Sequence, residues 1–230
     1  MPTPGANNPY SNGPASEQIA HIRETLLMMA SLADRNLSLA LRCLVERDEK
    51  LADTVESEDS QLDELEVSID ELVINHMATH APVATDCRFM LVASKVSNNL
   101  ERIGDQAVAI TRRARVLNQE PLLKPLIDIP RMAQIAEGML RDGITAFVDR
   151  KPELAQEIIK RDKEVDVINK QLARELTSFM LEDPATITRA LNLMIVARCL
   201  ERVADHCKNI AEEVYYLYQA KDIRHDRNPA

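Results

Sequence analysis

Apolar residues recur at alternating intervals of three and four positions through six stretches of this chain. Such spacing places an apolar stripe along one side of an α-helix and leaves the other sides polar. In the third stretch, for example, Val96, Leu100 and Ile103 keep to a single seam. We therefore predict six helices, with approximate ranges 16–53, 57–79, 86–117, 131–149, 152–181 and 184–217.

The second half of the chain repeats the pattern of the first. Pro121, Pro125 and Pro130 separate the halves. After a shift of 100 positions, the third predicted helix matches the sixth: Leu91, Val96, Leu100, Glu101, Arg102, Asp105 and Ile110 recur as Leu191, Val196, Leu200, Glu201, Arg202, Asp205 and Ile210. Internal repetition of this kind is typical of a duplicated structural unit. We predict an all-α fold of two tandem three-helix bundles at 16–120 and 131–221, a Pro-rich joint at 121–130, a disordered N-terminal tail at 1–15 and a polar C-terminal tail at 222–230.

Composition supports helix and limits the choice of partner. The 230 residues include only 5 Gly, no Trp and 3% aromatic side chains. A net charge of -9 argues against nucleic acid as the main partner, because binding a phosphate backbone requires a basic face. The start of the chain lacks the features of a secretory signal, and no stretch approaches the roughly 18 apolar residues of a membrane span. We expect a soluble cytoplasmic protein with reduced thiols at Cys43, Cys87, Cys199 and Cys207.

Pairs of carboxylates four residues apart recur on four of the predicted helices. Residues at i and i+4 share one helix face, with Cβ atoms roughly 5–6 Å apart, so the two charges repel. The pairs lie beside the apolar seams, at matching places in the two repeats: Asp59 with Asp63, Glu101 with Asp105, Asp162 with Asp166, and Glu201 with Asp205. If neighbouring helices pack antiparallel, two pairs face each other in each bundle and four carboxylates converge near the surface.

We interpret each set of four carboxylates as a metal site. Oxygen ligands in this number suit magnesium, calcium, manganese or iron, and bridging carboxylates can hold more than one ion. Sites made of oxygen alone differ from structural zinc sites, which usually recruit Cys or His. A bound ion would offset the repulsion and stabilise the bundles.

Other interpretations stay open at this point. In a second interpretation the acids only hydrate the bundle surface, and the chain is a metal-free helical adaptor. A carboxylate-bridged di-iron protein needs Glu-x-x-His on inward-facing helices, and no histidine here has Glu three residues before it. His76 and His80 fit packing at a helix end better than metal binding. His206 points away from its neighbour Asp205. No motif for a catalytic nucleophile or a phosphate loop is present, so we do not expect an enzyme.

Several segments resemble the signature helices of the PhoU family of phosphate-uptake regulators. They are Asn99-Leu-Glu-Arg-Ile-Gly-Asp105, Leu200-Glu-Arg-Val-Ala-Asp-His206, Asn209-Ile-Ala-Glu-Glu213, Pro82-Val-Ala-Thr-Asp-Cys-Arg88 and Asp222-Ile-Arg-His225. The resemblance covers about residues 16–226. It implies two bundles that hold iron, zinc or other divalent ions such as manganese or magnesium. The implied ligands are Asp59, Asp63, Glu101 and Asp105 at the first site, and Asp162, Asp166, Glu201 and Asp205 at the second.

The resemblance also implies a function. Members of this family repress the phosphate-starvation response without being enzymes, and they link a phosphate ABC transporter ATPase to a sensor histidine kinase, often as homodimers. We expect contact with the membrane only through such partners. The second repeat has His206 and Asn209 where the first has Gln106 and Ala109. We therefore expect the two sites to differ in affinity or in the number of ions.

Overall fold

The computed structural model describes residues 14–224, and all six predicted helices are present in it. Residues 1–13 of the predicted N-terminal tail and 225–230 of the predicted C-terminal tail lie outside the described residues. The elements are α1 Pro14–Val45, α2 Lys50–His80, α3 Ala84–Asn118, α4 Asp128–Asp149, α5 Leu154–Glu182, the short 3-10 helix η1 Pro184–Thr186, and α6 Ile187–Gln219. These helices confirm the all-α fold class.

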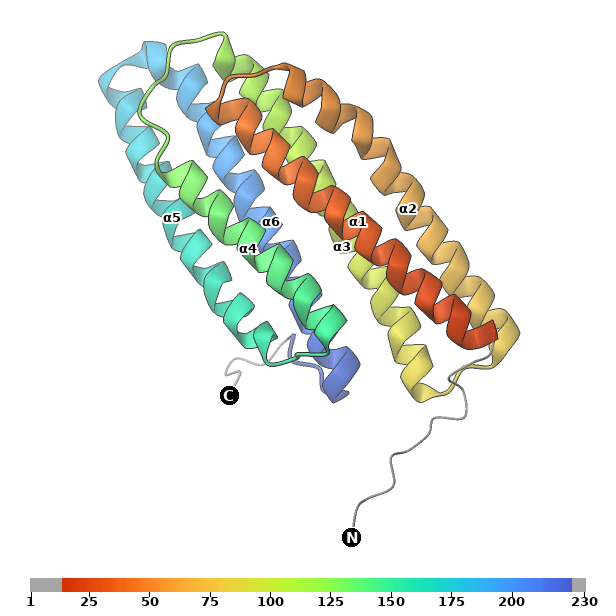
Figure 1. The fold of residues 1–230 in the computed structure, drawn as a ribbon. Coiled ribbons are helices and arrows are strands. Elements are labelled where there is room, and N and C mark those ends of the chain that lie inside the picture. The colour runs from red at the N-terminus through yellow and green to blue at the C-terminus, as the bar shows by residue number, and fades with distance from the viewer. Residues whose placement is uncertain (1–13, 225–230) are drawn as a thin grey trace.

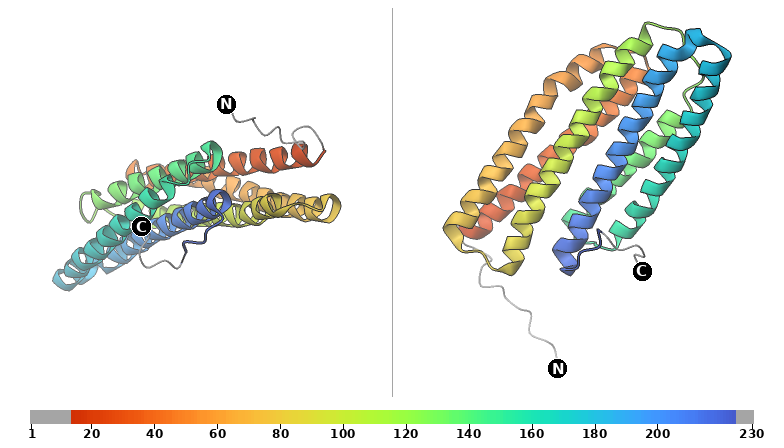
Figure 2. Two further views of the ribbon diagram at one scale, coloured as in Figure 1. Left: turned by 90° about the horizontal axis from the view of Figure 1, so that it is seen from below. Right: turned by 180° about the vertical axis from the view of Figure 1, so that it is seen from behind.

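Four helices form one layer and two helices cover it. Helices α2, α3, α6 and α5 lie side by side in that order, and α1 and α4 pack on one side of them, in front in Figure 1 and behind in Figure 2, right. Helices α1 to α3 make one three-helix bundle and α4 to α6 the other, as the duplication predicts. Helices α3 and α6 run antiparallel at the centre of the layer. Within residues 14–224, no helix covers the outer face of this layer.

The two bundles share one continuous core. Helix α3 packs against α6 as extensively as against α1, and the buried seam residues of all six helices belong to a single apolar cluster. At one end of it, Phe89 of α3 and Phe147 of α4 stack with ring centroids 6.2 Å apart. The guanidinium of Arg23 on α1 lies over both rings, 5.3 and 5.2 Å from their centroids. This cation–π contact ties α1 and α3 of the first bundle to α4 of the second.

The turn between α1 and α2 lies earlier than the sequence predicts. Helix α1 ends at Val45 and α2 begins at Lys50, whereas the predicted bounds were 53 and 57. No Gly or Pro marks this turn. Instead Arg47 adopts the left-handed conformation, with φ 58°, and its guanidinium donates to the carbonyl of Glu120, 2.8 Å away. A contact with a residue distant in sequence therefore sets this boundary.

Helix α4 also begins earlier than predicted, at Asp128 instead of 131. Pro130 lies within its first turn. Proline is tolerated there because the first N–H groups of a helix have no intrahelical partner. Pro130 therefore belongs to the helix and not to the joint before it.

Two further observations concern the whole described chain. None of the helices within residues 14–224 has an apolar stretch long enough to cross a membrane. Cys43, Cys87, Cys199 and Cys207 are all free thiols, as the sequence predicts.

Candidate metal centre

The four acid pairs lie on the four helices of the layer, one pair on each helix. Each pair brackets an apolar residue of the core; on α2, the fully buried Leu62 lies between Asp59 and Asp63. Because that residue faces the core, the two acids that flank it lie at the edge of the buried face of the helix. The corresponding fully buried residues are Ile103 on α3, Val165 on α5 and Val203 on α6.

The acids of neighbouring helices face each other in two sets. In the first set, burial raises the pKa of Asp59 on α2, and the charges of Asp63 and of Asp105 on α3 raise it further. In the second set, burial raises the pKa of Glu201 on α6, followed by the charges of Asp205 and of Asp166 on α5. This mutual repulsion shows that each set gathers negative charge from two helices.

The four carboxylates of each set nevertheless do not lie close enough together to form one ligand sphere. Within residues 14–224, no three Asp, Glu, His or Cys side chains lie close enough together to hold one ion. In the first set, Arg102 engages both acids of α3. Its Nη1 lies 2.9 Å from Asp105 Oδ2, and its Nε lies 3.2 Å from Glu101 Oε2. Metal binding here therefore requires the two acids to rotate away from Arg102 and toward α2.

In the first set, Glu101 has a buried oxygen that lacks a hydrogen bond. Its side chain is 13% exposed, and its buried Oε2 accepts no hydrogen bond despite the nearby Arg102. Burial and then the charge of Asp105 raise the pKa of Glu101 to about 7, which Arg102 offsets only in part. A buried carboxylate without hydrogen bonds is unfavourable unless a proton or a cation compensates its charge. The first set therefore fits a cation held by oxygen ligands.

Gly104 lets α2 and α3 approach closely at the first set. A Cβ atom on Gly104 would lie 2.3 Å from Leu62 Cδ1 and 3.5 Å from Asp59 Oδ1. The space beside Gly104 is thus filled by Leu62, and Asp59 comes within contact distance of α3. The matching position of the second repeat is Ala204.

The second set already contains a cation. Lys208 of α6 places its Nζ 2.9 Å from Asp162 Oδ2 on α5 and 3.1 Å from Asp205 Oδ1 on its own helix. Asp162 is buried, with 7% of its surface exposed. Burial raises the pKa of Asp162, and Lys208 opposes that rise by donating a hydrogen bond to the carboxylate. Burial lowers the pKa of Lys208, but the same two carboxylates together raise it by more, so its ammonium stays charged.

A comparison with protein families also detects two copies of one unit in this chain. The model of the PhoU domain family matches residues 26–114 and 129–214. The chain belongs to the PhoU family. Each of the two matched segments contains one complete carboxylate set, so the PhoU domain and its acids occur once in each bundle.

Similar proteins align along most of this PhoU-family chain. "Phosphate-specific transport system accessory protein PhoU homolog" from Pseudomonas putida is 35% identical over 209 residues, covering 90% of this chain and 82% of that protein. The homolog from Aquifex aeolicus is 36% identical over 209 residues, covering 91% and 95%. The crystal structure of PhoU from Pseudomonas aeruginosa is 34% identical, with a TM-score of 0.87, and covers 89% of this chain and 99% of that one.

A cleft at the centre of the layer separates the two carboxylate sets of this PhoU-family protein. Its volume is about 470 Å³, and its lining includes Arg102 and Gln106 from α3 and Arg202 and His206 from α6. The Nδ1 atom of His206 lies 3.0 Å from Oδ1 of Asn99 on α3. Burial lowers the pKa of His206. His206 therefore joins the two bundles and does not extend either carboxylate set.

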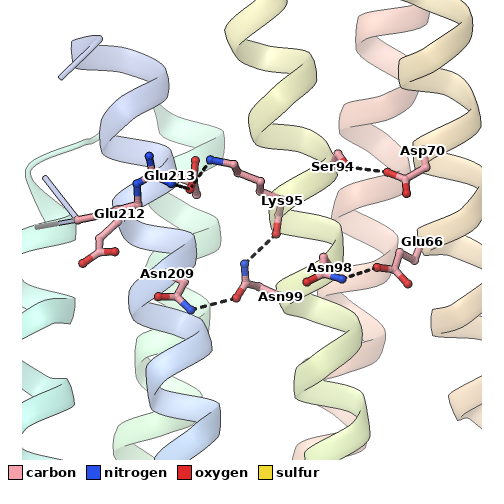
Figure 3. Close-up of a pocket in the computed structure, with 10 residues that line it drawn as sticks. Glu66, Asp70, Ser94, Lys95, Asn98, Asn99, Asn209, Glu212 and Glu213 are labelled. Atoms are coloured by element: carbon pink, nitrogen blue, oxygen red, sulfur yellow. Dashed lines mark hydrogen bonds and ion pairs between the residues drawn. The ribbon is translucent and has the colours of Figure 1, made fainter. Parts of the chain in front are cut away.

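A second polar cleft, of about 480 Å³, opens farther along the same interface (Figure 3). Lys95 of α3 reaches across it to Glu213 of α6, with Nζ 2.9 Å from Oε1. On the other side of α3, Asn98 donates to Glu66 of α2 at 2.8 Å. These contacts connect α2 and α3, which carry the first carboxylate set, to α6 at the centre of the layer.

Sequence reasoning placed the acids but missed the basic residue among them. The available signal was the difference between Val108 and Lys208, which occupy matching positions of the two repeats. His76 and His80 take no part in the site: their rings stack with centroids 4.9 Å apart, and His76 Nδ1 lies 3.0 Å from Gln18 Oε1. Their role in packing at the end of α2 is as predicted.

Proposed function

We propose that this chain is a non-enzymatic regulator of phosphate uptake that represses the phosphate-starvation response. The observation that supports this role is the match to the PhoU domain in both bundles. The relatives that align along most of the chain are called phosphate-specific transport system accessory proteins. Those names support a role beside the transporter.

In this role the chain links the ATPase of a phosphate ABC transporter to a phosphate-responsive sensor histidine kinase. It works in the cytoplasm as a homodimer and meets the membrane only through these partners. The outer face of the four-helix layer supports such a role, because the helices of residues 14–224 leave it open and it carries two polar clefts between the bundles.

The first carboxylate set holds divalent or ferric ions such as iron, zinc, manganese or magnesium. A bound ion supplies positive charge that offsets carboxylate repulsion and ties two neighbouring helices together. In the first set the ligands are Asp59, Asp63, Glu101 and Asp105. The observation that supports metal binding there is the buried Oε2 of Glu101, which accepts no hydrogen bond.

Two double variants test the proposed function. Glu101→Gln with Asp105→Asn removes two ligands and keeps the shape of the side chains. Glu64→Gln with Glu71→Gln removes two exposed acids of α2 that lie outside the set and serves as the matched control. In a strain that lacks the chromosomal copy, we expect the control to repress a phosphate-starvation reporter in high phosphate and the ligand variant to fail. Unaltered reporter expression on deletion of the protein itself would contradict a regulatory role.

A metal-free helical adaptor is the second candidate. The contacts of Arg102 with Glu101 and Asp105 favour it, because a guanidinium already neutralises part of the first set. Metal analysis of the purified protein separates the two candidates. Metal bound to the wild type and the control but lost from the ligand variant supports the first, whereas full repression by a metal-free wild type supports the adaptor.

A further inference from the structure

The two carboxylate sets differ in the charge that lies between their helices. In the first set, Asp59 and Asp63 of α2 form no ion pair within the described residues, and Arg102 pairs only with the acids of its own helix. In the second set, Lys208 pairs with Asp162 of α5 and with Asp205 of α6 at the same time. Among the described residues, only the second set therefore has a side-chain cation that bridges its two helices.

The difference arises from one position of the repeat. A shift of 100 residues places Val108 where Lys208 stands. Val108 is 5% exposed and belongs to the core, so it offers no charge to the first set. Lys208 lies three residues after Asp205, on the same helix face, and its side chain is 27% exposed. Its stem is thus largely covered while the ammonium reaches across to α5.

The position of the ammonium matters for any ion that enters the second set. Two of the four carboxylates there, Asp162 and Asp205, already accept hydrogen bonds from the ammonium of Lys208. An entering metal would have to displace the ammonium and would then be repelled by it at close range. Asp162, with 7% exposure, has little solvent to compensate for the loss of its partner.

We propose that Lys208 is a built-in cation that takes the place of metal in the second set, so that this chain binds metal at the first set only. This inference rests on the proposed metal binding by the first set. The contact between α5 and α6 in the second bundle is then independent of the metal concentration. In the first bundle, metal binding strengthens the contact between α2 and α3.

The test measures the number of ions bound and the set that binds them. Mn²⁺ and Zn²⁺ are titrated separately into the purified full-length protein by calorimetry, with metal content checked by elemental analysis after dialysis. Lys208→Met removes the charge and keeps the length of the stem, and Lys208→Val installs the residue of the first repeat. Lys163→Met, at an exposed position of α5, is the matched control. Glu101→Gln with Asp105→Asn disables the first set, and Glu201→Gln with Asp205→Asn disables the second.

We expect the wild type and Lys163→Met to lose all binding when the first set is disabled and to keep it when the second is disabled. Lys208→Met and Lys208→Val are expected to bind about twice as many ions as the wild type, with the added ions lost when Glu201 and Asp205 are replaced. In chelator, both Lys208 variants are expected to melt below the Lys163→Met control and to recover on addition of metal.

The outcomes distinguish this inference from the metal function on which it rests. If disabling the second set halves binding by the wild type, Lys208 does not exclude metal, although metal binding itself stands. If the wild type binds metal and the Lys208 variants bind no additional ions, the inference about Lys208 is wrong and metal binding by the first set still stands. If neither the wild type nor the Lys208 variants bind metal, the inference and the proposed metal function both fail. The melting temperature in chelator shows in each case whether a Lys208 variant is folded.

Discussion

Lys95 on α3 and Glu213 on α6 form an ion pair across the interface between the two bundles, with Nζ 2.9 Å from Oε1. Glu213 is 6% exposed, and its other basic neighbour, Arg224, is farther away, with Nη1 at 3.5 Å. Because a buried carboxylate depends on its partner, this pair is one of the polar contacts that set the register of α3 against α6.

Replacing Lys95 by Met should therefore destabilise the protein. We expect the free energy of unfolding to fall by about 2 kcal/mol, because Glu213 would keep its charge in a buried place with only the more distant Arg224 beside it. Denaturant titration measures the change, with Lys163→Met as the control at an exposed site. Equal stability of the two variants would show that the pair contributes nothing to the interface.

The raised pKa of Glu101 should make stability depend on pH in the absence of metal. The folded-state pKa of about 7 lies above the ordinary value of 4.5, so between these values the folded state binds more protons than the unfolded one. Stability is then highest below pH 4.5 for this group and declines as pH rises toward 7. Relative to Glu101→Gln, the wild type should lose up to about 3 kcal/mol over that interval.

Chemical denaturation in chelator at several pH values between 5 and 8 gives this difference. Parallel curves for the wild type and Glu101→Gln would mean that Glu101 is not perturbed. Protons compete with metal for the same carboxylate, so we also expect metal affinity to fall as the pH drops below about 7.

Replacing Gly104 by Ala should destabilise the first bundle, although alanine favours helix by about 1 kcal/mol over glycine. The added methyl would lie 2.3 Å from Leu62 Cδ1 and force that fully buried side chain to move. We expect a net loss of about 1–2 kcal/mol and weaker metal binding, because α2 must shift away from α3.

Gly138→Ala provides the control for this prediction. Gly138 lies on α4, where an added methyl would meet only the end of the Arg161 side chain, at 3.4 Å. We expect this variant to gain about 0.5–1 kcal/mol in thermal or denaturant unfolding. A stabilising Gly104→Ala would show that Leu62 repacks without cost.

The end of α4 offers a site for stabilisation. Arg150 adopts the left-handed conformation, with φ 58°, at the C-cap of α4, and its exposed side chain makes no hydrogen bond or ion pair within residues 14–224. Glycine adopts this conformation without strain, so Arg150→Gly should raise the melting temperature by an amount equivalent to about 0.5–1 kcal/mol.

Arg47 has the same backbone conformation but should respond in the opposite direction. Its guanidinium donates to the carbonyl groups of Asn118 and Glu120, so Arg47→Gly loses contacts that hold the turn between α1 and α2. Calorimetric melting of both variants checks the contrast. A stabilised Arg47→Gly would show that the turn does not depend on these hydrogen bonds.

The helices and the placement of the acids follow from features that are local in sequence. The alternating seam through Val96, Leu100 and Ile103 is enough to predict a helix and its buried side, and all three residues are buried. Once a seam is known, the i, i+4 geometry places Glu101 and Asp105 beside it. Helices and their faces are therefore predictable where the apolar period is unbroken.

The remaining features depend on contacts between residues far apart in the chain. The turn at Arg47 is set by the carbonyl groups of Asn118, the last residue of α3, and of Glu120 just after it, which no local pattern reveals. A lysine three residues after an aspartate is common on helices, and only the packing of α5 against α6 shows that Lys208 also reaches Asp162. The conformation of the carboxylates is likewise set by Arg102, whose contacts the sequence leaves undetermined.

Anomalous diffraction from crystals of the wild-type protein saturated with Mn²⁺ tests the central claim most directly. We predict a peak between α2 and α3 with carboxylate oxygens of both helices about 2.0–2.6 Å away, and with Asp105 turned away from Arg102. A map at saturating metal with no peak at this groove, and with Asp105 still paired to Arg102, would contradict metal binding by the first set.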